Sequence, residues 1–293
     1  MNLKYVNKIK ANLSIYAKKK AKNLLDGTYQ SVYIGKSLNF ENLREYDIND
    51  DYKDIDWKSS TRTGSLLVKQ YIAEKKYNIL FVLDTGSKME GSTPTGDLKK
   101  EIALYTAGTL SYIALLDGDF IGMLFNNGNK VNLYPFKLNN YALEEYLSNY
   151  DKNACIQSNN TINDLLKYIN KNIKKTMIVI VITDLNGLDS ITDKTLKEVS
   201  LKNDIMFVNI EDSYLFGENN FDIDKKEYVP QVLSLDDELY EYERQLKDEM
   251  YNKIKLKMDK NQISMVSIDR FNEINDKIVE LLEKNNYGSK NRT

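Results

Sequence analysis

The chain has 293 residues, of which 42% are hydrophobic and 29% charged, and its 41 basic and 43 acidic side chains give a net charge of −2. These proportions suit one large domain or two smaller ones, and they provide no general basic surface for nucleic acid. Histidine is absent and Cys155 is the only cysteine. Ser-His-Asp triads, internal disulfides and zinc sites built from histidine or cysteine ligands are therefore excluded.

The N-terminal residues 3–25 have apolar side chains at roughly helical spacing, with lysines on the other face. We expect a helix with a solvated basic face, and peripheral contact with anionic lipid is the alternative. The basic start lacks a continuous apolar core, so it does not resemble a signal peptide, and no apolar run approaches the roughly 20 residues that span a bilayer. A cytoplasmic protein without a transmembrane segment is the expectation.

Residues 28–64 are polar and irregular in pattern, and residues 65–74 predict a strand. Two lysines separate that strand from the next, so the pair forms either a hairpin or one bent strand. Further strands are predicted at 77–84, 120–125, 130–136, 177–183 and 205–210, and helices at 97–116, 140–149, 162–173 and 190–201. This alternation predicts an α/β fold, a Rossmann-like doubly wound and mostly parallel sheet with helices on both faces.

Beyond residue 211 the chain becomes acidic and less regular. It predicts an outlying strand at 227–233, a long charged helix at 236–260, a strand at 263–268 and a closing helix at 271–282. We therefore divide the chain into an N-terminal segment (1–76), a core (77–212) and a C-terminal extension that packs on the core (213–293).

Two aspartates end the two most apolar strands, Asp84 after 79–83 and Asp184 after 177–183. In an open α/β sheet the ligand crevice lies at the carboxyl ends of the strands, so these carboxylates should face a shared cleft. Paired carboxylates can hold Mg²⁺. The alternative is that each aspartate caps the helix that follows its strand.

The loop after Asp84, DTGSK at 84–88, resembles the Asp-x-Ser-x-Ser motif of von Willebrand factor A domains. A longer resemblance is to the bacterial domain-of-unknown-function-58 family, which is von Willebrand A-like, and it covers residues 39–210. Its segments are LREY at 43–46, DD at 50–51, DWK at 56–58, TRTG at 61–64, VKQY at 68–71, NTINDL at 160–165 and VITDL at 181–185.

The resemblance implies a metal-ion-dependent adhesion site in which Asp84, Thr161 and Asp184 match the pattern of ligands. Gly86 and Lys88 stand where that pattern has serine, so one hydroxyl is missing and an ammonium group replaces the other. The site is therefore expected to be degenerate, with an ion pair from Lys88 to Asp84 or Asp184 in place of the metal. A solvent-facing Lys88, and weak Mg²⁺ binding by Asp84, Thr161 and Asp184, are the alternatives.

The segment that precedes the core mixes acidic side chains with Arg44, Arg62 and the sole tryptophan, Trp57. We expect Arg44 and Arg62 to form bidentate pairs with Asp50, Asp51 or Asp56, and we expect Trp57 to pack inward together with Ile55. The alternative is a docking surface formed by the residues of the family signature, since tryptophan and arginine are common interface anchors. Those residues are Arg44, Tyr46, Asp50, Asp56, Trp57 and Arg62.

The most consistent function is a non-enzymatic protein-interaction or adaptor module. The resemblance implies work beside a MoxR-type AAA+ ATPase in protein assembly or remodelling, with no required cofactor. Two alternatives stay open: a magnesium-dependent hydrolase of phosphate esters that uses Asp84 and Asp184, and a metal-dependent adhesion-type binder.

Overall fold

The computed structural model describes residues 3–28, 38–48, 50–73, 76–215, 221–222, 227–228 and 237–290. The chain forms two compact units, one of residues 1–31 with 77–293 and a smaller one of residues 32–76. The larger unit, called the core unit here, contains a six-stranded sheet and its covering helices. The smaller one, called the hairpin unit, contains a two-stranded antiparallel sheet.

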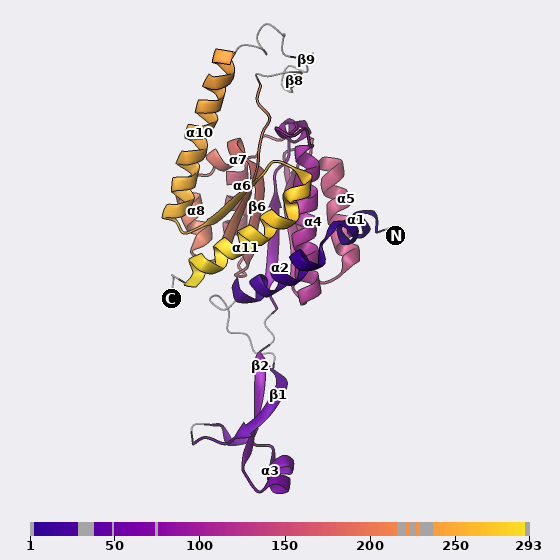
Figure 1. Ribbon diagram of the computed structural model, residues 1–293, viewed down its shortest axis with the longest axis vertical. Coiled ribbons are helices and arrows are strands. Elements are labelled where there is room, and N and C mark those ends of the chain that lie inside the picture. The colour runs from indigo at the N-terminus through magenta and orange to yellow at the C-terminus, as the bar shows by residue number, and fades with distance from the viewer. Residues whose placement is uncertain are drawn as a thin grey trace. The chain divides into compact units, whose positions relative to one another are not determined.

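The sheet of the core unit, in which β6 is labelled in Figure 1, has the strand order β10-β7-β6-β3-β4-β5. Neighbouring strands are parallel from β10 to β4, and only β5 at the edge is antiparallel. The strands are β3 (Asn78–Leu83), β4 (Phe120–Asn127), β5 (Lys130–Lys137), β6 (Ile178–Asp184), β7 (Asp204–Ile210) and β10 (Ser264–Ile268). Every residue of β6 and β7 is buried, as expected of parallel strands covered on both faces. The predicted fold class is confirmed.

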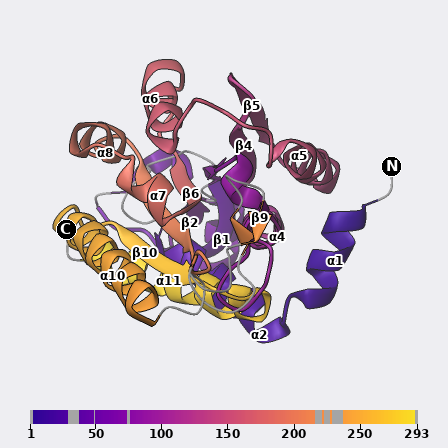
Figure 2. The same cartoon turned by 90° about the horizontal axis from the view of Figure 1, so that it is seen from above.

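Helices cover both faces of this sheet, as the view from above shows (Figure 2). One face carries α4 (Lys99–Asp117), α5 (Asn140–Asn153) and α11 (Ile274–Lys290), and the other carries α6 (Ile162–Asn172), α8 (Asp193–Ser200) and α10 (Asp237–Lys260). The short helix α7 (Leu185–Asp189) follows β6 directly. Helix α4 is buried almost all round, which matches its apolar sequence.

The N-terminal residues form two helices, α1 (Lys4–Asn12) and α2 (Ile15–Thr28), where the sequence predicts one. The break lies at Leu13, which is extended, and the Ser14 hydroxyl accepts a hydrogen bond from the Ala17 N–H as a new helix start. Both helices belong to the core unit, so the predicted N-terminal segment 1–76 is divided between the units. The reason is packing, since Val6 and Ile9 are buried and the backbone N–H groups at the start of α1 donate to the Glu144 carboxylate.

The hairpin unit differs from the irregular segment predicted for residues 28–64. Strand β1 (Leu38–Glu45) pairs antiparallel with β2 (Leu67–Ala73), and a short helix, α3 (Trp57–Thr63), lies between them in the chain. Strand β2 therefore makes no hairpin with β3. The sequence did not predict β1, because the polar residues of this strand, LNFENLRE, interrupt the alternation of apolar and polar side chains.

The C-terminal part follows the predicted order of helix, strand and helix, with β10 added to the edge of the sheet beside β7. The predicted strand 227–233 lies mostly outside the described residues. Its first two residues form β9 (Glu227–Tyr228), which pairs antiparallel with β8 (Phe221–Asp222). No helix in the described part of the chain is both long and apolar enough to cross a bilayer.

Candidate functional site

The two aspartates predicted from the sequence lie side by side at the carboxyl ends of β3 and β6. These strands are parallel neighbours, and the Asp84 N–H donates to the Ile182 carbonyl at 3.1 Å. Asp84 is 5% exposed and Asp184 is fully buried. Two carboxylates this deep in the protein require compensation by positive charge or hydrogen bonds.

Lys88 supplies part of that compensation from a 3₁₀ turn, η3 (Ser87–Glu90), that follows the strand. Its ammonium nitrogen lies 2.6 Å from Asp84 Oδ2 and 3.1 Å from Asp184 Oδ1. The ion pair expected with one of the two aspartates is thus present with both. About a third of the Lys88 side chain remains exposed, so this ion pair lies at the solvent side of the cluster.

A second lysine, Lys99, lies beneath the first and was not anticipated from the sequence. It is 1% exposed at the start of α4, and its ammonium lies 2.8 Å from Asp184 Oδ2 and also pairs with Asp212. A signal for it existed: Lys99 precedes Ile102 and Ala103 by three and four residues, which places it on the buried face of the predicted helix. The site therefore holds three carboxylates and two ammonium groups.

Backbone and hydroxyl donors complete the environment of the two carboxylates. Asp84 accepts from the Thr85 N–H at 2.8 Å and from the Thr183 hydroxyl. Asp184 accepts from the Gly187 N–H at 2.8 Å and so caps α7, which means that the capping alternative and the paired-carboxylate arrangement hold together. Position 187 requires glycine, because the Cβ atom of any other residue would collide with the Thr183 hydroxyl and lie 2.7 Å from Asp84 Oδ2.

These surroundings set the protonation of the cluster. Burial opposes ionisation of Asp184, but Lys99 and Lys88 outweigh it and lower the pKa of Asp184 to about 2. Burial raises the pKa of Asp84 and the neighbouring Asp184 adds to it, while Lys88 acts in the opposite direction. Burial also opposes the charge on Lys88, yet Asp84 and Asp184 together raise its pKa, so the ammonium form is favoured.

Thr161 is the N-cap of α6 and lines a cavity of about 270 Å³ together with Asp84, Gly86, Lys88 and Gly187. Its hydroxyl is engaged in the helix cap, since it donates to Asp164 Oδ2 at 2.9 Å and accepts from the Asp164 N–H. The structure thus brings Thr161 to the same cavity as the aspartates, but its hydroxyl oxygen is hydrogen-bonded to Asp164 in the helix cap.

The side chains of this cavity do not fit a magnesium ion. The Lys88 ammonium lies between the two carboxylates that would bind the ion, Gly86 offers no side chain, and the Thr161 hydroxyl serves a helix cap. Gly86 also has φ of +120°, a backbone conformation that a serine would adopt only with strain. Across the described residues, no three or more acidic or cysteine side chains are grouped to hold a metal.

The other residues of the family signature lie in the hairpin unit. Arg44 forms the expected bidentate pair with Asp50, at 2.7 and 2.5 Å, whereas Arg62 is exposed and has no ion pair among the described residues. Tyr46 is half-buried and its N–H donates to the Leu66 carbonyl.

The expectation that Trp57 packs inward is wrong, because its side chain is 63% exposed. Asp56 is the N-cap of α3, with its carboxylate accepting from the Ser59 N–H at 3.0 Å, and Trp57 is the first helical residue. The helix start ends the extended alternation that would have placed Trp57 on the same face as Ile55.

Comparison with known proteins gives one family and several distant structural likenesses. Curated relatives include uncharacterized proteins of Mycobacterium tuberculosis and Mycobacterium bovis, 24% identical over 123 residues. That match covers 42% of this chain and only 38% of those proteins.

Among solved structures, the conserved hypothetical protein BatB from Bacteroides thetaiotaomicron is 15% identical with a TM-score of 0.46, over 71% of this chain and 98% of that one. An aerotolerance-related membrane protein from Bacteroides fragilis is 14% identical with a TM-score of 0.43, over 71% and 99%. A von Willebrand factor type A structure from Catenulispora acidiphila is 9% identical with a TM-score of 0.39, over 75% and 45%.

The family model described as a protein of unknown function, DUF58, matches residues 42–214, which is more than half of the chain and includes both the hairpin-unit signature and the aspartate cluster. The chain belongs to the DUF58 family.

Proposed function

We propose that this protein is a non-enzymatic protein-interaction module that works with a MoxR-type AAA+ ATPase. The observation that carries the non-enzymatic part is the position of the Lys88 ammonium between Asp84 and Asp184. Each carboxylate that a phosphate-ester hydrolase or a metal-dependent adhesion site would use is neutralised by a lysine of the chain itself. The geometry therefore favours neither of those alternatives.

The interaction part of the proposal is supported by the hairpin unit. Four large apolar side chains of that unit are exposed: Ile48 at 88%, Tyr52 at 67%, Trp57 at 63% and Leu66 at 49%. Tryptophan and tyrosine are enriched among residues that dominate binding energy at interfaces. We assign Trp57 as an anchor for the protein partner.

The MoxR-type partner and the cytoplasmic location both come from the family resemblance and the sequence pattern, and they stay predictions. The partner is tested with the purified MoxR-type ATPase of the same organism and this chain immobilised at equal density. We expect saturable binding to the wild type and a loss of at least about tenfold in affinity for Trp57→Ala.

The matched control is Tyr141→Ala, which removes another exposed aromatic side chain, at 60% exposure on α5 of the core unit. It should bind as the wild type does. Trp57→Ala should also keep the wild-type unfolding midpoint, because an exposed ring contributes little to the free energy of unfolding. Absence of ATPase binding to the wild type would refute the partner, and equal binding by Trp57→Ala would refute the role of Trp57.

A further inference from the structure

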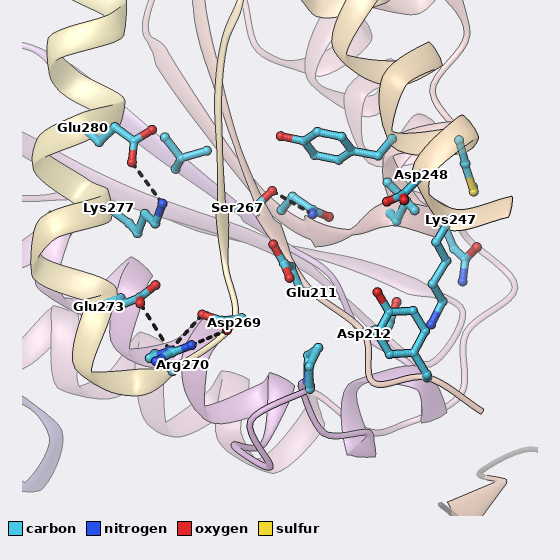
Figure 3. Close-up of a pocket in the computed structure, with 18 of the residues that line it drawn as sticks. Glu211, Asp212, Lys247, Asp248, Ser267, Asp269, Arg270, Glu273, Lys277 and Glu280 are labelled. Atoms are coloured by element: carbon cyan, nitrogen blue, oxygen red, sulfur yellow. Dashed lines mark hydrogen bonds and ion pairs between the residues drawn. The ribbon is translucent and has the colours of Figure 1, made fainter. Parts of the chain in front are cut away.

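A groove of about 600 Å³ lies at the carboxyl ends of β7 and β10, between α10 and α11. Figure 3 shows Lys277 and Glu280 of α11, with Glu273 just before that helix, on one side, Lys247 and Asp248 of α10 on the other, and Ser267 and Glu211 between them. Its volume is within the range of ligand-binding pockets. It is a different cavity from the one that Asp84 and Thr161 line.

The alternation of side chains along β7 and the edge strand β10 sends polar side chains into this groove. Asn209 and Glu211 are two residues apart and so lie on one face of the chain at the end of β7, and Ser267 of β10 is the register partner of Asn209. Ile210 follows Asn209 in β7 and Ile268 follows Ser267 in β10. Both are fully buried, as the alternation of side chains along a strand predicts. A strand end that presents polar groups to a cavity and apolar groups to the core is suited to recognition.

Asn209 carries a hydrogen-bond acceptor that the described residues leave unused. The residue is 3% exposed, and its Nδ2 donates to Ser267 Oγ at 3.1 Å. Its Oδ1 is buried and accepts no hydrogen bond from any described residue. A buried acceptor without a donor is costly, and such groups usually have a partner, so Oδ1 calls for a donor that enters the groove.

Acidic side chains outnumber basic ones around the groove, so some carboxylates have no basic partner there. Six acidic and four basic side chains line it, and each of the basic ones already has an acidic partner. The pairs join Lys247 to Glu243, Arg270 to Asp269 and Glu273, and both Lys277 and Lys284 to Glu280. Asp212 is paired with Lys99.

Two carboxylates of the lining, Glu211 and Asp248, have no ion pair or hydrogen bond to their side chains within the described residues. Partial burial raises the pKa of Glu211, and the carboxylates of Asp269 and Glu273 add to that effect while Lys277 opposes it. A ligand that brings positive charge would relieve this repulsion. The unused Asn209 Oδ1 acceptor is matched by an N–H donor, so a cation that carries N–H groups suits both the charge and the acceptor.

We propose that this groove binds an organic cation with N–H donors, a guanidinium or primary ammonium group. The cation pairs with the Glu211 carboxylate and donates a hydrogen bond to Asn209 Oδ1, beside Ser267. Two sources share this chemistry: an arginine or lysine side chain of a polypeptide partner, or a free small amine. The first source rests on the proposed interaction function, whereas the second does not.

The test uses calorimetric titration of the full chain with three probes: Nα-acetyl-arginine methylamide, its uncharged citrulline analogue, and agmatine. We expect saturable one-to-one binding of a guanidinium probe and none of the citrulline analogue. Glu211→Gln should weaken binding by about tenfold and Asn209→Leu by a smaller factor. Glu198→Gln is the matched control, because it removes one exposed acidic charge on α8 and leaves the same net charge as Glu211→Gln.

The relative affinities distinguish the sources. Tighter binding of the capped arginine points to a polypeptide, and tighter binding of agmatine points to a small amine. Because Asn209→Leu alters a buried position, the Asn209 side-chain amide resonance of the wild type, followed by NMR during the titration, provides a second readout. The proposal is overturned if no guanidinium probe binds up to about 10 mM, if citrulline binds equally well, or if Glu211→Gln binds as the wild type does. None of these measurements involves the ATPase, so their failure would leave the interaction proposal standing.

Discussion

Lys99 of α4 and Asp184 of β6 form an ion pair of 2.8 Å in which neither side chain has more than 1% of its surface exposed. The same ammonium pairs with Asp212, just beyond the end of β7, so one lysine joins the carboxyl ends of two neighbouring strands to the helix that covers them. A buried charge network of this kind is costly to break at one member, because the remaining charges lose their compensation.

Replacement of Lys99 by methionine should therefore be strongly destabilising. Lys99→Met leaves Asp184 and Asp212 with one ammonium fewer, and we expect a loss of about 3–5 kcal/mol in the free energy of unfolding. Lys100→Met is the neighbouring control, since Lys100 pairs with Asp151 near the surface and should cost under about 1 kcal/mol. Urea denaturation at pH 7 measures both, and equal losses would contradict a special role for Lys99.

Lys88→Met should destabilise less than Lys99→Met, and the loss should depend on pH. At pH 7 we expect about 2–3 kcal/mol, below the value for a fully buried pair because a third of the Lys88 side chain faces solvent. Without Lys88 the pKa of Asp84 rises further, so Asp84 binds a proton as the pH is lowered and the penalty shrinks near pH 4. Lys167→Met, which removes an exposed lysine paired with Asp164, should show neither effect. A loss that stays constant from pH 7 to pH 4 would argue against a charged Asp84 in the wild type.

The Asp184 carboxylate should stabilise the fold at neutral pH and lose this contribution in acid. Its pKa of about 2 lies below the value of about 3.9 in an unfolded chain, so its charge stabilises the fold above pH 4 and that stabilisation is lost as the pH falls to about 2. The shift corresponds to about 2–3 kcal/mol. The difference in unfolding free energy between the wild type and Asp184→Asn should be constant from pH 7 to about 4 and shrink below it. A difference that grows toward acid pH would reverse the sign and refute the assignment.

Gly187→Ala should be far more damaging than an ordinary substitution at a helix start. The added methyl group would overlap the Thr183 hydroxyl and crowd Asp84 Oδ2, which forces one of the two from its hydrogen bond. We expect a lowered melting temperature, with a loss of about 2–4 kcal/mol. Asn186→Ala alters the preceding exposed residue and should change stability by under about 1 kcal/mol. A stable Gly187→Ala protein would mean that β6 and α7 can separate at this point.

Magnesium should not stabilise the wild-type protein. A ligand that binds only the folded state raises its melting temperature, and here Lys88 holds the position that the ion would need. Lys88→Ser restores a hydroxyl and removes the competing charge, so this variant should melt lower than the wild type and recover part of the loss with Mg²⁺. Gly86 is left unchanged in this test, because its φ of +120° would add strain to any serine variant. Saturable stabilisation of the wild type by Mg²⁺ would contradict the replacement of the metal by lysine.

Much of the fold could be predicted from local pattern alone. The apolar runs of β3 and β6 and the helices between them give the parallel sheet, and its geometry then brings Asp84 and Asp184 together. The strand β1 and the helix start at Trp57 could not be predicted in this way. The first is stabilised by pairing with β2, and the second by an aspartate cap that the extended pattern of neighbouring residues concealed.

The sequence by itself determined the family, the parallel α/β sheet and the pair of aspartates, because each rests on short-range periodicity or on motifs with fixed spacing. The sequence also offered Lys88 as a counter-ion, but only the tertiary structure decided that Lys88 pairs with both aspartates and that Lys99 and Asp212 complete the cluster. It alone also showed which acceptors of the groove beside β7 and β10 have no partner among the described residues. Lys99 and Asp212 are 113 residues apart, and Asn209 and Ser267 are 58 apart, so no local pattern relates either pair. Their relation follows from the strand order, which places β7 between β6 and β10, and from the burial that makes each unpaired charge or acceptor costly.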